Sequence, residues 1–126
     1  MSALKFLVVD DSITMRRIVV NTLNNLGYKN VVEAVDGEDA LAKLQVEGDV
    51  GFIITDWNMP NMTGLDFVKA VRGNPDTKDL PILMVTTRGM KQDILEAMQA
   101  KVNSYIIKPF TPQIIKEKID KILASL

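Results

Sequence analysis

The sequence contains neither cysteine nor histidine in its 126 residues. Without cysteine, the chain has no disulfide, no thiolate nucleophile and no zinc–cysteine site. Without histidine, it has no imidazole base, no Ser-His-Asp triad and no histidine ligand for a metal. Any covalent chemistry must therefore use a carboxylate, a hydroxyl or a lysine.

A strong net charge and long apolar runs are missing as well. The formal net charge is −1, so the domain as a whole is not steered toward nucleic acid or an anionic membrane. No apolar run approaches the ~18 residues of a membrane span. The N-terminal stretch MSALKFLVVDD reaches an acidic pair too early for a secretory signal peptide. We therefore expect a cytoplasmic protein that binds neither nucleic acid nor membrane.

The residues that are present suit one folded domain. Hydrophobic residues make up 47% of the chain, which is enough for a proper core. Apolar segments alternate with segments whose apolar residues have helical spacing. The predicted strands cover residues 4–10, 30–35, 50–56, 82–86 and 104–108, and the predicted helices cover 12–27, 37–48, 65–73, 91–100 and 111–126. This alternation predicts a single α/β domain over residues 1–126, with a parallel sheet and helices on both faces.

Polar side chains collect where the predicted strands end. The polar residues at or just past those ends are Asp10, Asp11, Asp56, Thr86 and Lys108. Taken singly, an aspartate here is commonly a helix N-cap, a threonine makes a local hydrogen bond and a lysine is solvated. Together they lie at the carboxyl ends of successive strands, where open α/β sheets carry their ligand site. We therefore predict that they form one functional site.

Three carboxylates in one site repel one another. At ~4 Å and an effective dielectric of ~20, each like-charged pair costs about 4 kcal/mol. Lys108 offsets one charge, and a divalent cation that prefers oxygen ligands, Mg²⁺ or Mn²⁺, offsets the rest. These groups suit phosphoryl transfer to a carboxylate, which forms an aspartyl phosphate. The first candidate is Asp56, beside the only tryptophan, Trp57, whose ring we expect at the rim of the pocket.

Several motifs identify the family that the sequence resembles. They are FLVVDDS with TMRRIV, DWNMPNM with Gly64, PILMVTT, and SYIIKPFTP. Over essentially its whole length the chain resembles the receiver domains of two-component signalling, and among them the single-domain response regulators of chemotaxis. The resemblance implies a doubly wound, flavodoxin-like (βα)5 fold with five parallel strands in the order 2-1-3-4-5.

The resemblance also implies a role for each residue of the pocket. Asp56 is expected to accept the phosphoryl group. Asp11, Asp56 and the backbone carbonyl of Asn58 are expected to bind Mg²⁺, with Asp10 acting through water. Lys108 is expected to pair with the phosphoryl oxygens and with the Asp56 carboxylate.

A conformational switch is implied as well. Thr86 is expected to turn toward the phosphoryl group, and Tyr105 to follow from an outward to an inward rotamer. The Lys108–Pro109 peptide bond is expected to be cis. The resulting change on the fourth helix, fifth strand and fifth helix alters the affinity for a partner.

The resemblance implies partners for a monomeric signalling protein. A CheA-like histidine kinase is expected to donate the phosphoryl group, which agrees with the missing histidine here. A FliM-like flagellar switch protein is expected to bind the altered face, so that phosphorylation controls flagellar rotation, and a phosphatase is a further possible partner. The protein is not expected to be an enzyme with a separate substrate, although it catalyses its own phosphorylation and dephosphorylation.

Three alternatives stay open at this point. The first is a stand-alone receiver in another phosphorelay. The second is a phosphohydrolase of the haloacid dehalogenase type, although that class has a D-x-D motif and the first strand here ends in adjacent Asp10 and Asp11. The third is a metal-binding domain without catalysis. Positions that depart from the family pattern include Arg88, which replaces an acidic residue, and Lys101, which replaces a common glycine; if that position needs a positive φ, the lysine is slightly strained there.

Overall fold

The computed structural model describes residues 4–126, so the first three residues of the predicted domain lie outside the described part. Strands and helices alternate along the chain. The strands are β1 (Lys5–Val9), β2 (Val31–Ala34), β3 (Val50–Thr55), β4 (Ile82–Thr86) and β5 (Ser104–Ile107), and the helices are α1 (Ile13–Asn25), α2 (Gly37–Glu47), α3 (Gly64–Gly73), α4 (Lys91–Gln99) and α5 (Pro112–Ala124). All neighbouring strands are parallel, in the order β2-β1-β3-β4-β5. The predicted fold class and strand order are confirmed.

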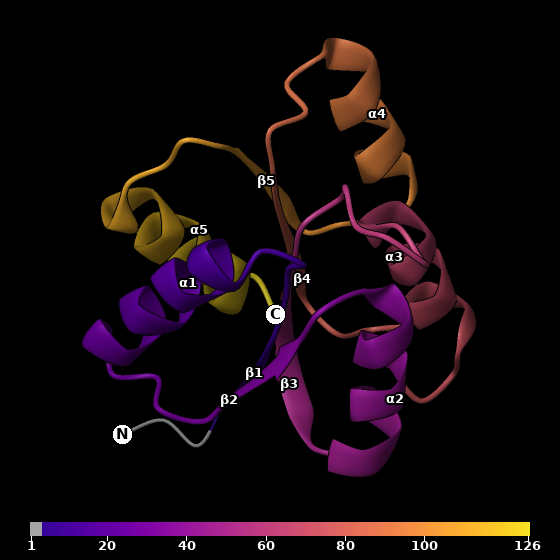
Figure 1. The fold of residues 1–126 in the computed structure, drawn as a ribbon, viewed down its shortest axis with the longest axis horizontal. Coiled ribbons are helices and arrows are strands. Elements are labelled where there is room, and N and C mark those ends of the chain that lie inside the picture. Colours follow the sequence, from indigo (N-terminus) through magenta and orange to yellow (C-terminus); the bar gives the residue numbers. More distant parts are fainter. Residues whose placement is uncertain (1–3) are drawn as a thin grey trace.

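Helices cover both faces of the sheet. Helices α1 and α5 lie on one side, and α2, α3 and α4 lie on the other (Figure 1). Because successive side chains of a strand point to opposite faces, Phe6 and Val8 of β1 pack on the α1 and α5 side, while Leu7 and Val9 pack on the other. A strand that is covered on both faces needs apolar residues at every position, which explains the unbroken apolar runs in the sequence.

Local signals in the sequence fix several helix ends. The hydroxyl of Ser12 accepts the Met15 N–H and caps α1, and Thr111 caps α5 in the same way, as its position before Pro112 predicts. Helix α2 ends at Gly48, whose φ of +67° is a left-handed conformation that glycine adopts without a steric penalty. Because Ser12 holds the capping position, the simpler role of Asp10 or Asp11 as the N-cap of α1 is wrong.

Four strands, β1, β2, β3 and β5, end one residue earlier than the sequence predicts, and a residue of the candidate site directly follows three of them. The residues that follow β1, β3 and β5 are Asp10, Asp56 and Lys108. Each still donates its backbone N–H to the neighbouring strand, at 3.1, 2.9 and 2.8 Å respectively. Their backbones are therefore held at the sheet edge, while their side chains, which lie past the strand ends, need not follow the strict alternation between the two faces of the sheet.

The turn after α4 contains a lysine in a left-handed conformation. Lys101 has a φ of +72°, as the resemblance predicted for this position. The turn is held by Arg72, whose Nε and Nη2 donate to the Lys101 carbonyl oxygen at 3.1 and 2.8 Å. The surroundings therefore hold a backbone conformation that a side chain with a Cβ disfavours.

Substituting Lys101→Gly is expected to raise the free energy of unfolding by about 1 kcal/mol, because glycine adopts positive φ readily. Urea unfolding followed by circular dichroism measures this gain. Lys101→Ala keeps the Cβ and serves as the control, which we expect to gain little. An equal gain in both variants would show that the lysine side chain, and not its backbone conformation, is unfavourable.

Within residues 4–126, the helices are too short or too polar to cross a membrane.

Candidate metal centre at the carboxyl ends of the strands

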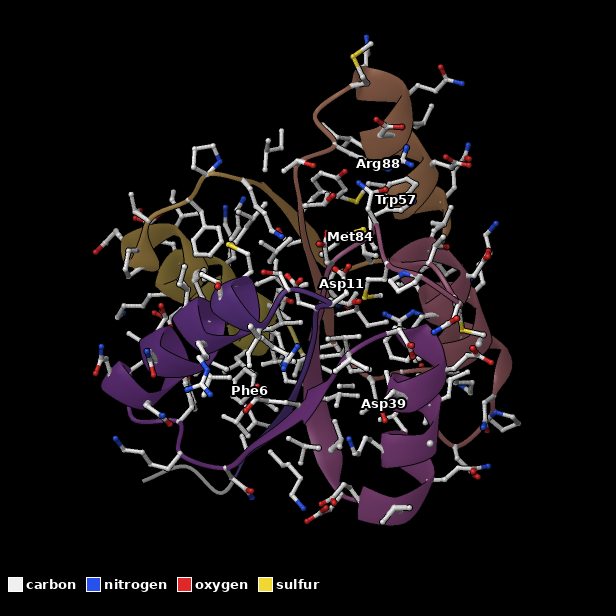
Figure 2. The ribbon with its side chains drawn as sticks, in the orientation of Figure 1. Phe6, Asp11, Asp39, Trp57, Met84 and Arg88 are labelled. Carbon is white, nitrogen blue, oxygen red and sulfur yellow. The ribbon has the colours of Figure 1, made fainter. Side chains whose placement is uncertain are left out.

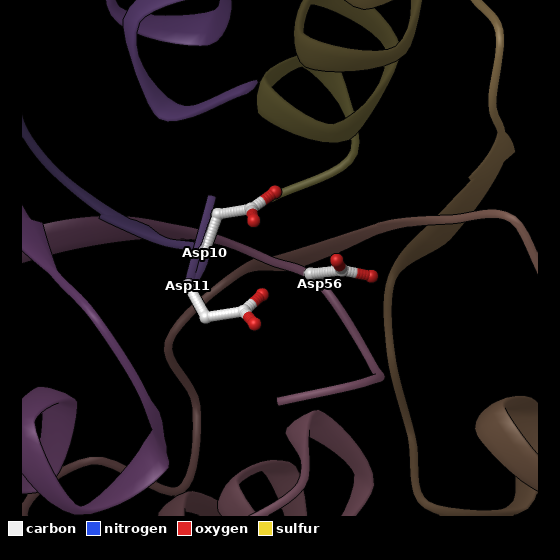
Figure 3. Close-up of side chains that lie close together, drawn as sticks. All are labelled: Asp10, Asp11 and Asp56. Carbon is white, nitrogen blue, oxygen red and sulfur yellow. The ribbon is translucent and has the colours of Figure 1, made fainter. Parts of the chain in front are cut away.

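Three carboxylates meet at the edge of the sheet. Asp10 and Asp11 follow β1 and Asp56 follows β3, and one carboxylate oxygen from each lies within 4.8 Å of the others. Figure 3 shows the three side chains around one small volume. Asp10 and Asp56 are buried, whereas Asp11 is exposed. The predicted convergence of these residues is thus present, with one carboxylate open to solvent.

Lys108 lies between the two buried carboxylates. Its Nζ is 3.2 Å from Asp10 Oδ2 and 3.1 Å from Asp56 Oδ2. The other oxygens of these carboxylates accept backbone N–H groups, from Ser12 at 2.9 Å and from Trp57 at 2.6 Å. The peptide bond that follows Lys108 is cis, as predicted. One ammonium group cannot neutralise three carboxylates, so the cluster has an excess of negative charge.

The exposed carboxylate is the one with unused oxygens. Within residues 4–126, the side chain of Asp11 makes no hydrogen bond or ion pair, unlike those of Asp10 and Asp56. Carboxylate oxygens grouped in this way, with a negative excess, suit a hard divalent cation such as Mg²⁺ or Mn²⁺. The residues present therefore fit a metal ion of this kind, and Asp11 could bind it without first breaking another contact.

Burial makes the negative charge of Asp10 unfavourable. Burial raises the pKa of its carboxyl above the usual value, and the charge of Asp56 adds to this. The Ser12 N–H and Lys108 act in the opposite direction without cancelling the effect. Since the pKa is higher in the folded than in the unfolded protein, the ionised carboxylate destabilises the fold near neutral pH, and this penalty disappears as the pH falls through the folded pKa.

Asp10→Asn is accordingly expected to raise the free energy of unfolding of the metal-free protein at pH 7 by about 1 kcal/mol, which is within the usual range of single stabilising substitutions. The amide oxygen can still accept the Ser12 N–H while the charge is removed. Thermal unfolding in a chelator, compared with the wild type at several pH values, measures the gain. We expect it to shrink toward acidic pH, and a gain that is independent of pH would contradict the electrostatic cause.

The loop after Asp56 is closed by a glycine. The Gly64 N–H donates to the Trp57 carbonyl oxygen at 2.8 Å. A Cβ at Gly64 would overlap the backbone carbonyl oxygen of Asp56 and lie within 2.8 Å of the Trp57 Cα. Gly64 therefore lets the start of α3 pack directly against the backbone that positions the Asp56 carboxylate. From the sequence, Gly64 could be recognised only as part of a family motif, without this packing role.

Asp36 lies outside this pocket. Although it comes just after β2, its carboxylate caps α2 by accepting the Asp39 N–H at 2.8 Å and also accepts the Asn61 side-chain N–H at 2.7 Å. These hydrogen bonds lower the pKa of its carboxyl. After β2, the aspartate therefore stabilises local structure, whereas the aspartates after β1 and β3 lie in the carboxylate cluster.

The two predicted switch residues meet at the backbone of Arg88. Thr86 is fully buried, and its Oγ1 accepts the Arg88 N–H at 3.2 Å. The hydroxyl of Tyr105 donates to the Arg88 carbonyl oxygen at 2.7 Å. Burial raises the pKa of Tyr105 to about 12, with Asp93 adding to the effect, so the phenol stays protonated as a donor.

Trp57 differs from its prediction. It was expected at the rim of the pocket, but it is only 4% exposed and belongs to the core on the α2, α3 and α4 side. The Arg88 guanidinium covers its ring at 4.6 Å from the centroid (Figure 2). The Arg88 side chain also bonds Asn58, the exposed residue predicted to offer its backbone carbonyl to the metal. The sequence showed Arg88 as an unusual residue, but no spacing pattern linked it to these partners.

The fold and the site together define a class of protein: a doubly wound α/β domain with a carboxylate and lysine site at the carboxyl ends of its strands. The sequence matches the response regulator receiver domain family over residues 6–120. It is 53% identical to chemotaxis protein CheY1 of Helicobacter pylori over 122 residues, and this matched region covers 97% of this chain and 98% of that protein.

Two further comparisons agree. Chemotaxis protein CheY of Pseudomonas aeruginosa is 53% identical over 119 residues, covering 94% of this chain and 95% of that protein. The structure of the chemotaxis response regulator CheY4 of Vibrio cholerae matches with a TM-score of 0.88 and 40% identity, over 96% of this chain and 99% of that chain. The chain belongs to the response regulator receiver domain family, and within it to the chemotaxis receivers of the CheY type, so the resemblance drawn from the motifs is confirmed.

Proposed function

We propose that this receiver accepts a phosphoryl group on Asp56 from a histidine kinase and then binds the flagellar motor switch. The observation that carries the proposal is the joint position of the carboxylates and Lys108 at one sheet edge. In the reaction, a carboxylate oxygen of Asp56 bonds to phosphorus while the bond from phosphorus to the donor imidazole nitrogen breaks. The electron pair of that bond leaves with the imidazole, which sits on the partner because this chain has no histidine.

A divalent cation, Mg²⁺ or Mn²⁺, fits the same site. Asp11, Asp56 and the backbone carbonyl of Asn58 would hold it, with Asp10 acting through water. When bound, it supplies positive charge that offsets the oxygens of the donor and acceptor. Asp11 is exposed and free of other contacts among the described residues, which suits it to meet an ion that arrives from solvent.

Lys108 and Thr86 complete the reaction site. The Nζ of Lys108 already contacts Asp56 Oδ2 at 3.1 Å, so it lies where it can pair with an oxygen of the incoming phosphoryl group. The hydroxyl of Thr86 can donate to another of these oxygens after it turns. With these groups the protein promotes its own phosphorylation and dephosphorylation, and acts as a signalling protein with no separate substrate.

The output surface in this proposal is formed by α4, β5 and α5. An apolar groove there is lined by residues that include Ile94, Met98, Tyr105, Phe110 and Ile114. Met98 and Ile114 are exposed large apolar side chains. The phosphoryl group favours one arrangement of Thr86 and Tyr105, and the groove that Tyr105 lines changes its affinity for the motor switch as a result. The names of the relatives support a role in chemotaxis.

Trp57 provides the test, since it is the only tryptophan and lies beside Asp56. Fluorescence is followed while Mg²⁺ and then acetyl phosphate are added. We expect one change with Mg²⁺ and a second with acetyl phosphate that requires Mg²⁺. Binding of the phosphorylated protein to an N-terminal peptide of the flagellar switch protein then separates motor control from another phosphorelay. A protein that responds to neither addition would contradict the proposal.

A further inference from the structure

Two hydrogen bonds hold the backbone on either side of Asp11. Because the exposed side chain of Asp11 makes no hydrogen bond within residues 4–126, the position of its carboxylate depends on its backbone. The Asp10 carbonyl oxygen, in the peptide group before Asp11, accepts Arg16 Nη1 at 2.8 Å. The Ser12 N–H, in the peptide group after Asp11, donates to Asp10 Oδ1 at 2.9 Å. Since a peptide group is planar, each bond helps to fix a plane that contains the Asp11 Cα.

The guanidinium of Arg16 is anchored on its other side to the edge of the sheet. Arg16 lies in α1, and its Nε donates to Glu33 Oε1 on β2 at 2.9 Å. The Arg16 side chain is only 11% exposed, so it has little freedom to leave this position. Among the described residues, its ion-pair partner is Glu33, outside the carboxylate cluster. Arg16 therefore meets the cluster through the Asp10 backbone, while Glu33 pairs with its charge.

We propose that Arg16 is a positioning residue for the metal centre, which holds the peptide group between Asp10 and Asp11 so that the Asp11 carboxylate faces the cation. Figure 3 shows this carboxylate turned toward the volume that it shares with Asp10 and Asp56. Without the bond from Arg16, that peptide group can rotate and carry the Asp11 side chain away from the volume. This inference rests on the proposed function, because that proposal places a divalent cation between Asp11 and Asp56.

The chemistry of arginine suits this role. A guanidinium is a rigid, planar fork whose Nε and Nη1 can donate to two separate acceptors at once, here Glu33 and the Asp10 carbonyl oxygen. A lysine has a single ammonium group on a flexible stem, which cannot hold both acceptors in the same geometry. Groups that orient metal ligands from outside commonly change metal affinity by tenfold or more when they are removed.

The probe for the test is Mn²⁺ alone, because the paramagnetic resonance signal of the free ion measures binding directly. Arg16→Ala is expected to raise the Kd for Mn²⁺ about tenfold, since Asp11 loses its fixed orientation. Electrostatics alone predicts the opposite, because removing a positive charge near a cation site strengthens cation binding. The direction of the change therefore separates positioning from charge, and an unchanged or lower Kd would overturn the proposal.

Two further variants control the result. Arg17→Ala removes the same charge from the next residue of α1, whose side chain is exposed, and we expect a Kd equal to or slightly below that of the wild type. A rise equal to that of Arg16→Ala would overturn the proposal in favour of a general effect of α1. Arg16→Lys keeps the charge but loses the fork, and we expect an intermediate Kd. If Arg16→Ala does not fold, Arg16→Lys decides the question, and a Kd at or below the wild-type value would overturn the proposal.

Thermal unfolding distinguishes positioning from a purely structural role. Saturating Mn²⁺ raises the unfolding temperature by an amount that depends on its affinity for the folded protein. If Arg16 only stabilised the fold, Arg16→Ala would unfold at a lower temperature in chelator but gain as much from a fixed Mn²⁺ concentration as the wild type. We expect a smaller gain, and an equal gain would overturn the proposal.

The binding experiment also separates the two proposals. If the wild type binds Mn²⁺ and the Arg16 variants bind it equally well, the positioning role is wrong and the proposed function stands. If the wild type does not bind Mn²⁺, the metal site of the proposed function is wrong and the positioning role is overturned with it.

Discussion

Asp56→Asn is expected to abolish phosphorylation of the protein by acetyl phosphate. The amide is neutral and a much poorer nucleophile than the carboxylate, so we expect phosphoprotein formation to fall by more than about a thousandfold, as when other nucleophiles are removed. The asparagine has nearly the same shape, and its side-chain oxygen can still accept the Trp57 N–H that Asp56 accepts at 2.6 Å. The fold should therefore persist, and intact-mass spectrometry after incubation with Mg²⁺ and acetyl phosphate measures the loss.

The matched control is Asp66→Asn. Asp66 is an exposed carboxylate in the first turn of α3, outside the cluster at the sheet edge. We expect this variant to be phosphorylated like the wild type. Phosphorylation of Asp56→Asn at the level of Asp66→Asn would mean that another residue accepts the phosphoryl group.

Gly64→Ala is expected to be the most damaging substitution outside the carboxylate cluster. The added Cβ would overlap the Asp56 carbonyl oxygen, and because that atom belongs to the backbone, no side chain can rotate to relieve the clash. We expect a loss of about 3 kcal/mol in the free energy of unfolding, at the upper end of overpacking effects. Phosphorylation should fall as well, because the loop that positions Asp56 must shift. Urea unfolding and the phosphorylation assay above measure the two effects.

The control for this substitution lies at the other end of the same helix. At Gly73, a Cβ would meet no atom within 4 Å, and the residue has no positive φ. Gly73→Ala is therefore expected to be neutral or to stabilise the protein by up to about 1 kcal/mol. Similar losses in Gly64→Ala and Gly73→Ala would show that close packing on the Asp56 backbone is not the cause.

Short-range chemistry explains why much of the fold could be predicted. Thr111 before Pro112 predicts a helix start, and Gly48 predicts a helix end, because each acts on backbone groups within a few residues. The apolar strand segments predict a sheet covered on both faces for a similar reason. The errors at the ends of β1, β3 and β5 are one residue each. They arise because Asp10, Asp56 and Lys108 keep one backbone hydrogen bond to the sheet although the strand has ended.

The convergence of the carboxylates and Lys108 could also be predicted, because a parallel sheet brings the carboxyl ends of its strands to one edge. The same argument could not show which residues at the strand ends lie outside the site. Asp36 follows β2, but its carboxylate turns to cap α2 and to bind Asn61. That choice depends on which backbone N–H groups and side chains lie nearby, and the strand pattern does not contain this information.

The sequence by itself determined which residue types are available for chemistry, the alternation of strands and helices, and the residues that the sheet edge collects. Residue type sets the chemistry and local periodicity sets the elements, so both can be predicted from the chain alone. Only the tertiary structure decided that Trp57 is buried, that the Arg88 side chain covers it, and that the Arg88 backbone forms hydrogen bonds with the side chains of Thr86 and Tyr105. These contacts join residues from separate loops and strands, and they depend on how side chains pack between the elements once the fold has brought them together.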